Sequence, residues 1–199
     1  MIITNEAALV DNDFICHISE SKLPENDICN VLEIIMRELD RYAIIHILVK
    51  QKELDISSIA SSKPVINSLF SKNIISEATF SDIFDGDTAK QSYYEFLIQD
   101  FFSILNPDEQ MVLNSEEDVL TYWRTGKSLG EIHSLVTCIV CGCGIFLSDD
   151  SDSKRIAEYI KQKYMGDINV LNRSELVNTE KIKAVLDRKT RKSLSHSAH

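Results

Sequence analysis

Apolar positions along this chain follow two patterns, short continuous runs and stripes with helical spacing. The runs at residues 7–10, 145–147 and 168–171 have the length and composition of buried strands in a parallel sheet. Ahead of the second run, one helical face is marked by apolar residues three and four positions apart: Ile132, Leu135, Val136, Ile139 and Val140. This alternation predicts an α/β protein with three layers, α/β/α, around a central and mostly parallel sheet.

Other helices are expected from the same spacing and from their end signals. Residues 26–39 carry a helical apolar stripe, and Asp87 can cap a long helix that Asn106 and Pro107 end. Asp152 or Ser153 is expected to start the helix after residues 145–147. Residues 43–49 are apolar without a clear period, so strand and helix both remain open there.

Composition narrows the class of protein. The chain has 199 residues, 44% of them hydrophobic and 26% charged, which suits one folded core. No apolar run approaches the roughly 20 residues that span a bilayer, and no signal peptide is evident, so we expect a cytoplasmic protein without a membrane segment. The five cysteines, an odd number, do not suggest a disulfide framework, and we expect the three at Cys138, Cys141 and Cys143 to serve packing.

Acidic residues follow two of the expected strands directly. Asp11 and Asp13 come after residues 7–10, and Asp149, Asp150 and Asp152 come after residues 145–147. The carboxyl ends of parallel strands meet at one edge of a sheet, where ligands bind. Crowded carboxylates repel one another, and a hard divalent cation relieves the repulsion. The pattern therefore predicts a Mg²⁺ or Mn²⁺ site that cleaves a phosphodiester.

Several of these acids also have ordinary structural roles open to them. Glu131 follows Ser128 at the spacing of a capping box, so it can be explained as a helix cap. Asp152 can be an N-cap, and Asp149 can face solvent. For Asp11 and Asp150 the functional interpretation leads, because acids at the ends of buried strands lie near low-dielectric surroundings.

At these residues the sequence resembles a known family. Ala-Leu-Val-Asp11-Asn-Asp13-Phe resembles the first strand of PIN-domain nucleases. Leu-Gly-Glu131 with its helix, then Ile-Phe-Leu-Ser-Asp-Asp150-Ser-Asp152, is similar to the closing half of that domain, and Lys154-Arg155-Ile-Ala continues the pattern.

The resemblance implies a metal-dependent endoribonuclease that cleaves single-stranded RNA, as VapC-like toxins and RNA-processing enzymes do. It implies a PIN-like fold with a set of catalytic acids: Asp11, Glu53, Glu131 and Asp150. The implied ligands of Mg²⁺ or Mn²⁺ are Asp11, Glu131, Asp150 and Asp152. Lys154 and Arg155 are the implied substrate-binding residues. They would provide local positive charge on a chain whose net charge of −10 does not attract nucleic acid in bulk.

The family's remaining acid has two candidates here. Glu53 follows an apolar segment like the one that precedes this acid in the family, and we favour it over Glu38. The matching motifs suggest one PIN-like domain over residues 1–178 with a helical insertion at about 55–127. Residues 179–199 are expected to form a C-terminal helix and a frayed tail.

Two other functions remain open. One is a PIN-like module that has kept the fold and serves as a binding or scaffold protein. The other is a phosphatase similar to the haloacid dehalogenases, with Asp11 as nucleophile and Asp13 as the second acid, although Phe14 and Ile15 depart from that family's pattern. An antitoxin or other protein partner and a homodimer also stay open.

Overall fold

The computed structural model describes residues 3–56, 62–113 and 118–195. Its centre is a sheet of five strands: β1 (Ala7–Val10), β2 (Tyr42–His46), β3 (Ile75–Ala78), β4 (Ile145–Leu147) and β5 (Asn169–Leu171). The strands lie in the order β3-β2-β1-β4-β5, and every pair is parallel. The predicted α/β class with a parallel central sheet is confirmed.

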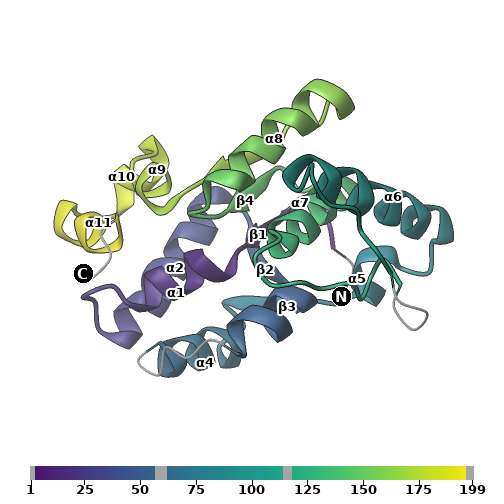
Figure 1. Ribbon diagram of the computed structural model, residues 1–199. Helices are drawn as coiled ribbons and strands as arrows, with labels where there is room; N and C mark the ends of the chain where they lie inside the picture. The colour runs from purple at the N-terminus through teal and green to yellow at the C-terminus, as the bar shows by residue number, and fades with distance from the viewer. Residues whose placement is uncertain (1–2, 57–61, 114–117, 196–199) are drawn as a thin grey trace.

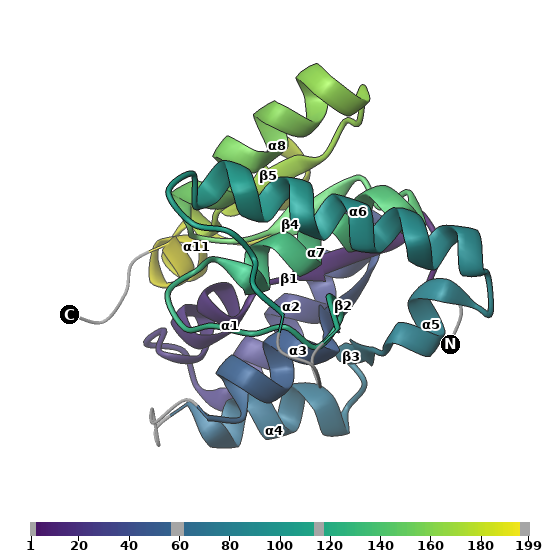
Figure 2. The ribbon, with the colours of Figure 1, turned by 45° about the vertical axis from the view of Figure 1, so that its right-hand side comes forward.

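Helices cover both faces of the sheet (Figures 1 and 2). One layer is formed by α1 (Asn12–Ser19), α2 (Glu25–Leu39) and α4 (Lys63–Ser71), together with the C-terminal helices α9 (Arg173–Val177), α10 (Glu180–Val185) and α11 (Arg188–Ser195). The other is formed by α5 (Phe80–Phe84), α6 (Thr88–Leu105), α7 (Leu129–Cys141) and α8 (Ser151–Tyr164). These are the three predicted layers.

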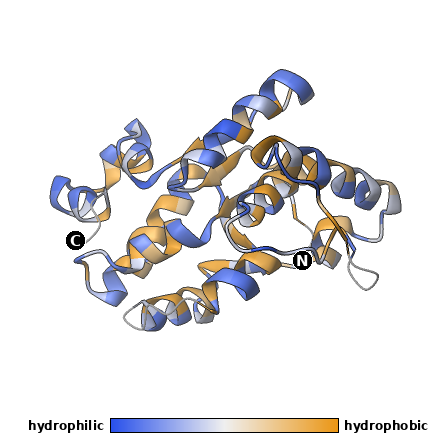
Figure 3. Ribbon diagram, viewed as in Figure 1, coloured by the Kyte–Doolittle hydropathy of each residue, from blue (hydrophilic) through white to orange (hydrophobic). Residues whose placement is uncertain are grey.

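Each strand contributes side chains to the cores on both sides of the sheet, because successive side chains point to opposite faces. Ala8 and Val10 of β1 pack with the first layer, whereas Ala7 and Leu9 pack with the second. Figure 3 shows the strands as mainly hydrophobic, while α8 is largely hydrophilic on the outside of the molecule. A strand buried on both faces is therefore apolar throughout, which is why β1 and β4 could be found as continuous runs.

The ambiguous segment 43–49 contains both kinds of structure. Strand β2 ends at His46, and the chain continues into a short α3 (Ile47–Val49) and a π-helical turn, η1 (Lys50–Leu54). Its apolar run lacked a clear period because a strand period and a helical period are joined within it. The π-turn at its end carries Glu53.

The expected helical insertion at 55–127 contains a strand as well as helices. Helices α4, α5 and α6 are present, but β3 pairs with β2 and completes one side of the sheet. The strand is only four residues long, with buried residues at its two ends and half-buried ones between them, a pattern too short to stand out. This span thus forms part of the central sheet and of both cores.

The C-terminal segment also differs from its prediction. The single expected helix is divided into α10 and α11, since the backbone of Leu186 is extended. Helix α11 continues to Ser195, and buried Leu194 packs in the first core, so the fraying expected from Ser193 is wrong for residues 193–195. The rest of the predicted frayed tail, residues 196–199, lies outside the described residues.

Two further findings concern the whole described chain. No helix in the ranges described above is long and apolar enough to cross a membrane. All five cysteines are free thiols; of the three for which packing was expected, Cys138 and Cys143 are buried and Cys141 is half-buried.

Candidate metal centre

Asp11 lies at the centre of the sheet edge where the carboxyl ends of the strands meet, which we call the acidic edge. It follows β1, the middle strand of the sheet, and its backbone N–H donates to the Leu147 carbonyl oxygen at 2.9 Å. Its carboxylate is buried, with Oδ2 accepting a hydrogen bond from Ser148 Oγ at 3.1 Å. Oδ1 has no partner among the described residues, although Asp11 is the residue before α1 and could have capped it. Burial raises the pKa of Asp11 well above its usual value, and the charges of Glu131 and Glu53 add to that rise.

Glu53 reaches this edge from the π-turn after β2. Its carboxylate lies against the backbone at Gly130, where an added Cβ would be 2.5 Å from Oε1. Glycine at this position therefore allows Glu53 to approach the first turn of α7. Burial, followed by the charges of Glu131 and Asp13, raises the pKa of Glu53 to about 8.

Glu131 lies in the first turn of α7, but Ser128 does not form the capping box with it that the sequence allowed. Ser128 precedes the helix with a left-handed φ of 50° and makes no side-chain capping bond. Its hydroxyl instead donates to Asp152 Oδ2 at 3.3 Å. Glu131 is thus not part of a capping box, and burial together with the charges of Asp150 and Asp13 raises its pKa to about 7.

Asp150 is the N-cap of α8, and Ser148 connects it to Asp11. Asp150 Oδ1 accepts from the Asp152 backbone N–H at 2.7 Å, so the capping role expected for Asp152 belongs to Asp150. The Asp150 backbone N–H donates to Ser148 Oγ at 3.1 Å, and that hydroxyl donates to Asp11. One buried serine therefore fixes the relative positions of the two strand-end acids.

These acids border a pocket of about 340 Å³ lined by Glu53, Glu131 and Asp150. Among the described ion pairs, none involves these residues or Asp11. Among the residues that the structure describes, no three acidic, histidine or cysteine side chains lie close enough together to hold a metal ion. The carboxylates therefore stay apart, as expected for like charges that repel one another without a cation between them.

The donor set fits a hard divalent cation in its chemistry. It contains only carboxylate oxygens and nearby hydroxyls, the ligands that suit Mg²⁺ and Mn²⁺. The unpartnered Oδ1 of buried Asp11 is a polar atom that a cation would satisfy. Glu53 and Glu131 have long side chains whose staggered rotamers let their carboxylates move toward Asp11.

Other predicted site residues already have partners. Asp152 is paired with Arg155 Nη2 at 3.3 Å and accepts from Ser128, beside the acids but at the rim. Lys154 is paired with Glu175 at the start of α9. Neither Lys154 nor Arg155 lines the pocket, and both stay predictions as substrate-binding residues.

The choice between Glu53 and Glu38 has a clear geometric answer. Glu38 is in the last turn of α2, before β2 begins, and therefore lies at the amino edge of the sheet. Glu53 comes after β2 ends and borders the pocket with Glu131 and Asp150.

Asp149 does not simply face solvent. Its Oδ2 is bound by His17 Nδ1 at 2.8 Å and by the Arg173 guanidinium, and Oδ1 accepts from the Arg173 backbone N–H at 3.0 Å. The Asp149 side chain is 14% exposed and that of Arg173 8%. Burial is outweighed here by these hydrogen bonds and charges, which hold the pKa of Asp149 below its usual value. The hydrogen bonds of Asp149 thus link the end of β4 to α1 and α9.

Buried histidines behind the acidic edge have a structural arrangement. His46 Nδ1 accepts from the Leu48 backbone N–H at 3.1 Å, which leaves Nε2–H to donate to Tyr94 Oη at 3.1 Å. Tyr94 Oη lies 2.8 Å from His133 Nδ1. Burial lowers the pKa of both histidines, that of His133 to about 3. The three hydrogen-bonded side chains are therefore neutral.

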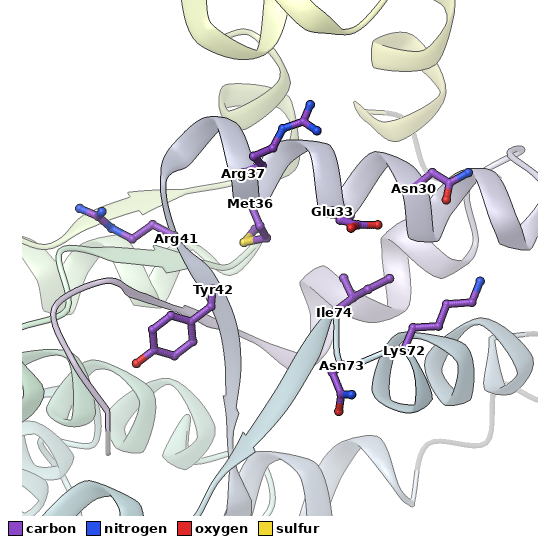
Figure 4. Close-up of a pocket in the computed structure, with 9 residues that line it drawn as sticks. All are labelled: Asn30, Glu33, Met36, Arg37, Arg41, Tyr42, Lys72, Asn73 and Ile74. Carbon is purple, nitrogen blue, oxygen red and sulfur yellow. The ribbon is translucent and has the colours of Figure 1, made fainter. Parts of the chain in front are cut away.

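A second hollow, of about 380 Å³, lies at the opposite edge of the sheet (Figure 4). It is bordered by α2 and by the segments that lead into β2 and β3. Its cationic residues do not converge, since Arg37 and Arg41 point away from each other and Lys72 lies on the far side. This hollow has no group of side chains suited to one ligand.

Sequence reasoning missed several residues at the acidic edge. Ser148 had a local signal, a small polar residue between a strand and an acid. Residues 123–128 and Lys52, which line the same pocket, had none, because their positions depend on contacts between distant segments. Comparisons with protein-family models, curated proteins and solved structures gave no match.

Proposed function

We propose that this chain is a metal-dependent endonuclease that hydrolyses single-stranded RNA with Mg²⁺ or Mn²⁺. The observation that supports this most is the buried carboxylate of Asp11, which has an unpartnered oxygen and further acids around it but no basic partner. At a structural site such as that of Asp149, basic side chains of the protein itself pair with the carboxylate. The site of Asp11 needs its positive charge from elsewhere.

The roles of the acids follow from the elements that hold them. Asp11, Glu131 and Asp150 come from β1, α7 and α8 and would hold the ion from three directions, with Asp152 at the rim. Glu53 faces them from η1 and would orient the attacking water. A bound divalent ion would lower the pKa of that water and stabilise charge on the phosphate. In the reaction, the water oxygen bonds to phosphorus, one phosphorus–oxygen ester bond breaks, and a proton ends on the leaving oxygen.

The test is cleavage of an end-labelled single-stranded RNA with Mn²⁺, together with Mn²⁺ binding measured by calorimetry. Asp150→Asn and Glu53→Gln should each lower the cleavage rate by about a hundredfold or more, since a metal contributes several kcal/mol to such transition states. Glu38→Gln is the matched control, because it makes the same chemical change at the opposite edge of the sheet.

Other outcomes would identify the alternatives. If the protein binds RNA but Mn²⁺ neither binds nor supports cleavage, the chain is a binding module. Hydrolysis of a small phosphate ester that is lost in Asp13→Asn would favour the phosphatase. An antitoxin or other protein partner, a homodimer and a cytoplasmic location stay predictions.

A further inference from the structure

The pocket lined by the carboxylates is also lined by basic residues, which we call the basic wall. Three basic residues line it: Lys52, Arg124 and Lys127. We propose that this basic wall binds the phosphates of the RNA strand and places one of them over the acids. The inference rests on the proposed nuclease function and names the residues that hold its substrate.

The wall is built from two segments that the fold brings together. Lys52 precedes Glu53 in η1, whereas Arg124 and Lys127 belong to the segment that leads into α7. Buried Tyr122 anchors that segment by packing edge-on against Phe102 of α6, with ring centres 5.7 Å apart. The Arg124 guanidinium lies 5.5 Å from the centre of the Tyr122 ring. The wall therefore has a packed support.

Lys52 and Arg124 are available for a ligand. Both are exposed, and among the described residues neither forms an ion pair. Lys127 is paired with Glu109 and would have to share its charge. By contrast, Lys154 and Arg155 are paired with Glu175 and Asp152 outside the pocket lining.

The charges that line the pocket favour an anionic ligand once a cation is present. Three carboxylates and three basic residues line the pocket, with Asp11 buried behind them. A bound divalent ion makes this lining net positive even when Asp11 is counted. A phosphodiester strand, with one negative charge per nucleotide, would be attracted there in spite of the protein's net charge of −10.

The chain contains a built-in reporter for this pocket. Its single tryptophan, Trp123, lies in the pocket lining and stacks near His133, with ring centres 6.4 Å apart. A strand bound along the basic wall should change the fluorescence of Trp123. Binding elsewhere on the surface should leave it unchanged.

The experiment titrates a single-stranded RNA oligonucleotide into the full chain in Ca²⁺, with gels to verify that the RNA stays intact. Trp123 fluorescence and the anisotropy of labelled RNA are followed at several salt concentrations. Lys52→Met and Arg124→Met should each weaken binding about tenfold and lower the salt dependence by about one phosphate contact. Methionine keeps a long apolar stem over Tyr122 and so guards against unfolding. Lys181→Met and Arg188→Met are matched controls, exposed and outside the pocket lining, and should change affinity less than twofold.

The outcomes separate this inference from the proposed function. If the wild type cleaves RNA with Mn²⁺ but Lys52→Met and Arg124→Met bind like the controls, the basic wall is overturned and the nuclease stands. If Mn²⁺ supports no cleavage yet binding depends on Arg124, the wall stands and the nuclease falls. If RNA neither binds nor changes Trp123 fluorescence, the wall is overturned. Equal binding of single-stranded DNA would widen the ligand class to both nucleic acids.

Discussion

Asp149 and Asp11 lie at the same edge of the sheet, yet the protein surrounds their carboxylates with opposite charges. Around Asp149 are Arg173 and His17, and the pKa of the acid is lowered. Around Asp11 are Glu131 and Glu53, and its pKa is raised. A buried carboxylate paired with a cation has its charge compensated, so that removing either partner destabilises the fold, whereas a buried cluster of acids without a cation is destabilising until a ligand binds. The comparison distinguishes a structural acid from candidate functional acids.

The largest expected effect on stability is at the structural acid. Asp149→Asn should lower the free energy of unfolding by about 3 kcal/mol, because it removes the carboxylate that forms an ion pair with the buried Arg173 guanidinium. Urea unfolding at pH 7 measures this. Adding Arg173→Met to the same variant should recover part of the loss. If the single variant is as stable as the wild type, Asp149 is not the structural acid described here.

The same substitution at Asp11 should act in the opposite direction. Without metal at pH 8, Asp11→Asn should raise the free energy of unfolding by about 1 kcal/mol, since it removes an acid that burial and Glu131 disfavour. The wild type should gain about 2.7 kcal/mol from Mn²⁺ at a hundred times its Kd, and the variant should lose this gain. Equal destabilisation by Asp11→Asn and Asp149→Asn would remove the contrast between the two sites.

A change at Gly130 tests the position of Glu53 without altering any charge. In Gly130→Ala, the new Cβ should displace the Glu53 carboxylate and lower the rate of Mn²⁺-dependent RNA cleavage about tenfold. The helix itself should gain up to about 1 kcal/mol from the alanine. Gly144→Ala is the control, because a Cβ there meets no atom within 4 Å. An unchanged cleavage rate in Gly130→Ala would show that Glu53 does not orient the attacking water.

The smallest effect is the pH dependence of stability without metal. Between pH 6 and pH 8 the unfolded chain has already released the Glu53 and Glu131 protons, while the folded protein, with pKa values of about 8 and 7, retains them. The folded state therefore binds more protons, and stability should fall by about 1 kcal/mol as pH rises. Thermal unfolding measures this fall, and Glu53→Gln should flatten it. A rise in stability over this range would contradict the arrangement of the acids.

Stability should also fall on the acidic side, for a different reason. The pKa values of His46 and His133 are lowered in the folded protein, so below about pH 6.5 the unfolded chain binds protons that the folded one does not. Below about pH 4.5 Glu53 is protonated in both states, so there the slope of stability with pH should be the same in Glu53→Gln as in the wild type.

Part of the site followed from local patterns. Asp11 and Asp150 were predictable because each follows a strand that is apolar on both faces, and parallel strands end at one edge. The helix of Glu131 was predictable from its apolar spacing and its end at Gly142, which adopts a left-handed φ of 72°. The π-turn that carries Glu53 was not, since nothing local distinguishes it from an ordinary turn of helix.

The sequence by itself determined the α/β class, the direction of the central strands and the acids at their ends, because these depend on periodicities within a few residues. Only the tertiary structure decided that Asp149 is neutralised by Arg173, that Glu53 rather than Glu38 lies near Glu131, and that Lys52 and Arg124 line the same pocket as the acids. Those relations join segments far apart in the chain. Charge compensation depends on distances in space, and residue spacing along the chain does not encode them.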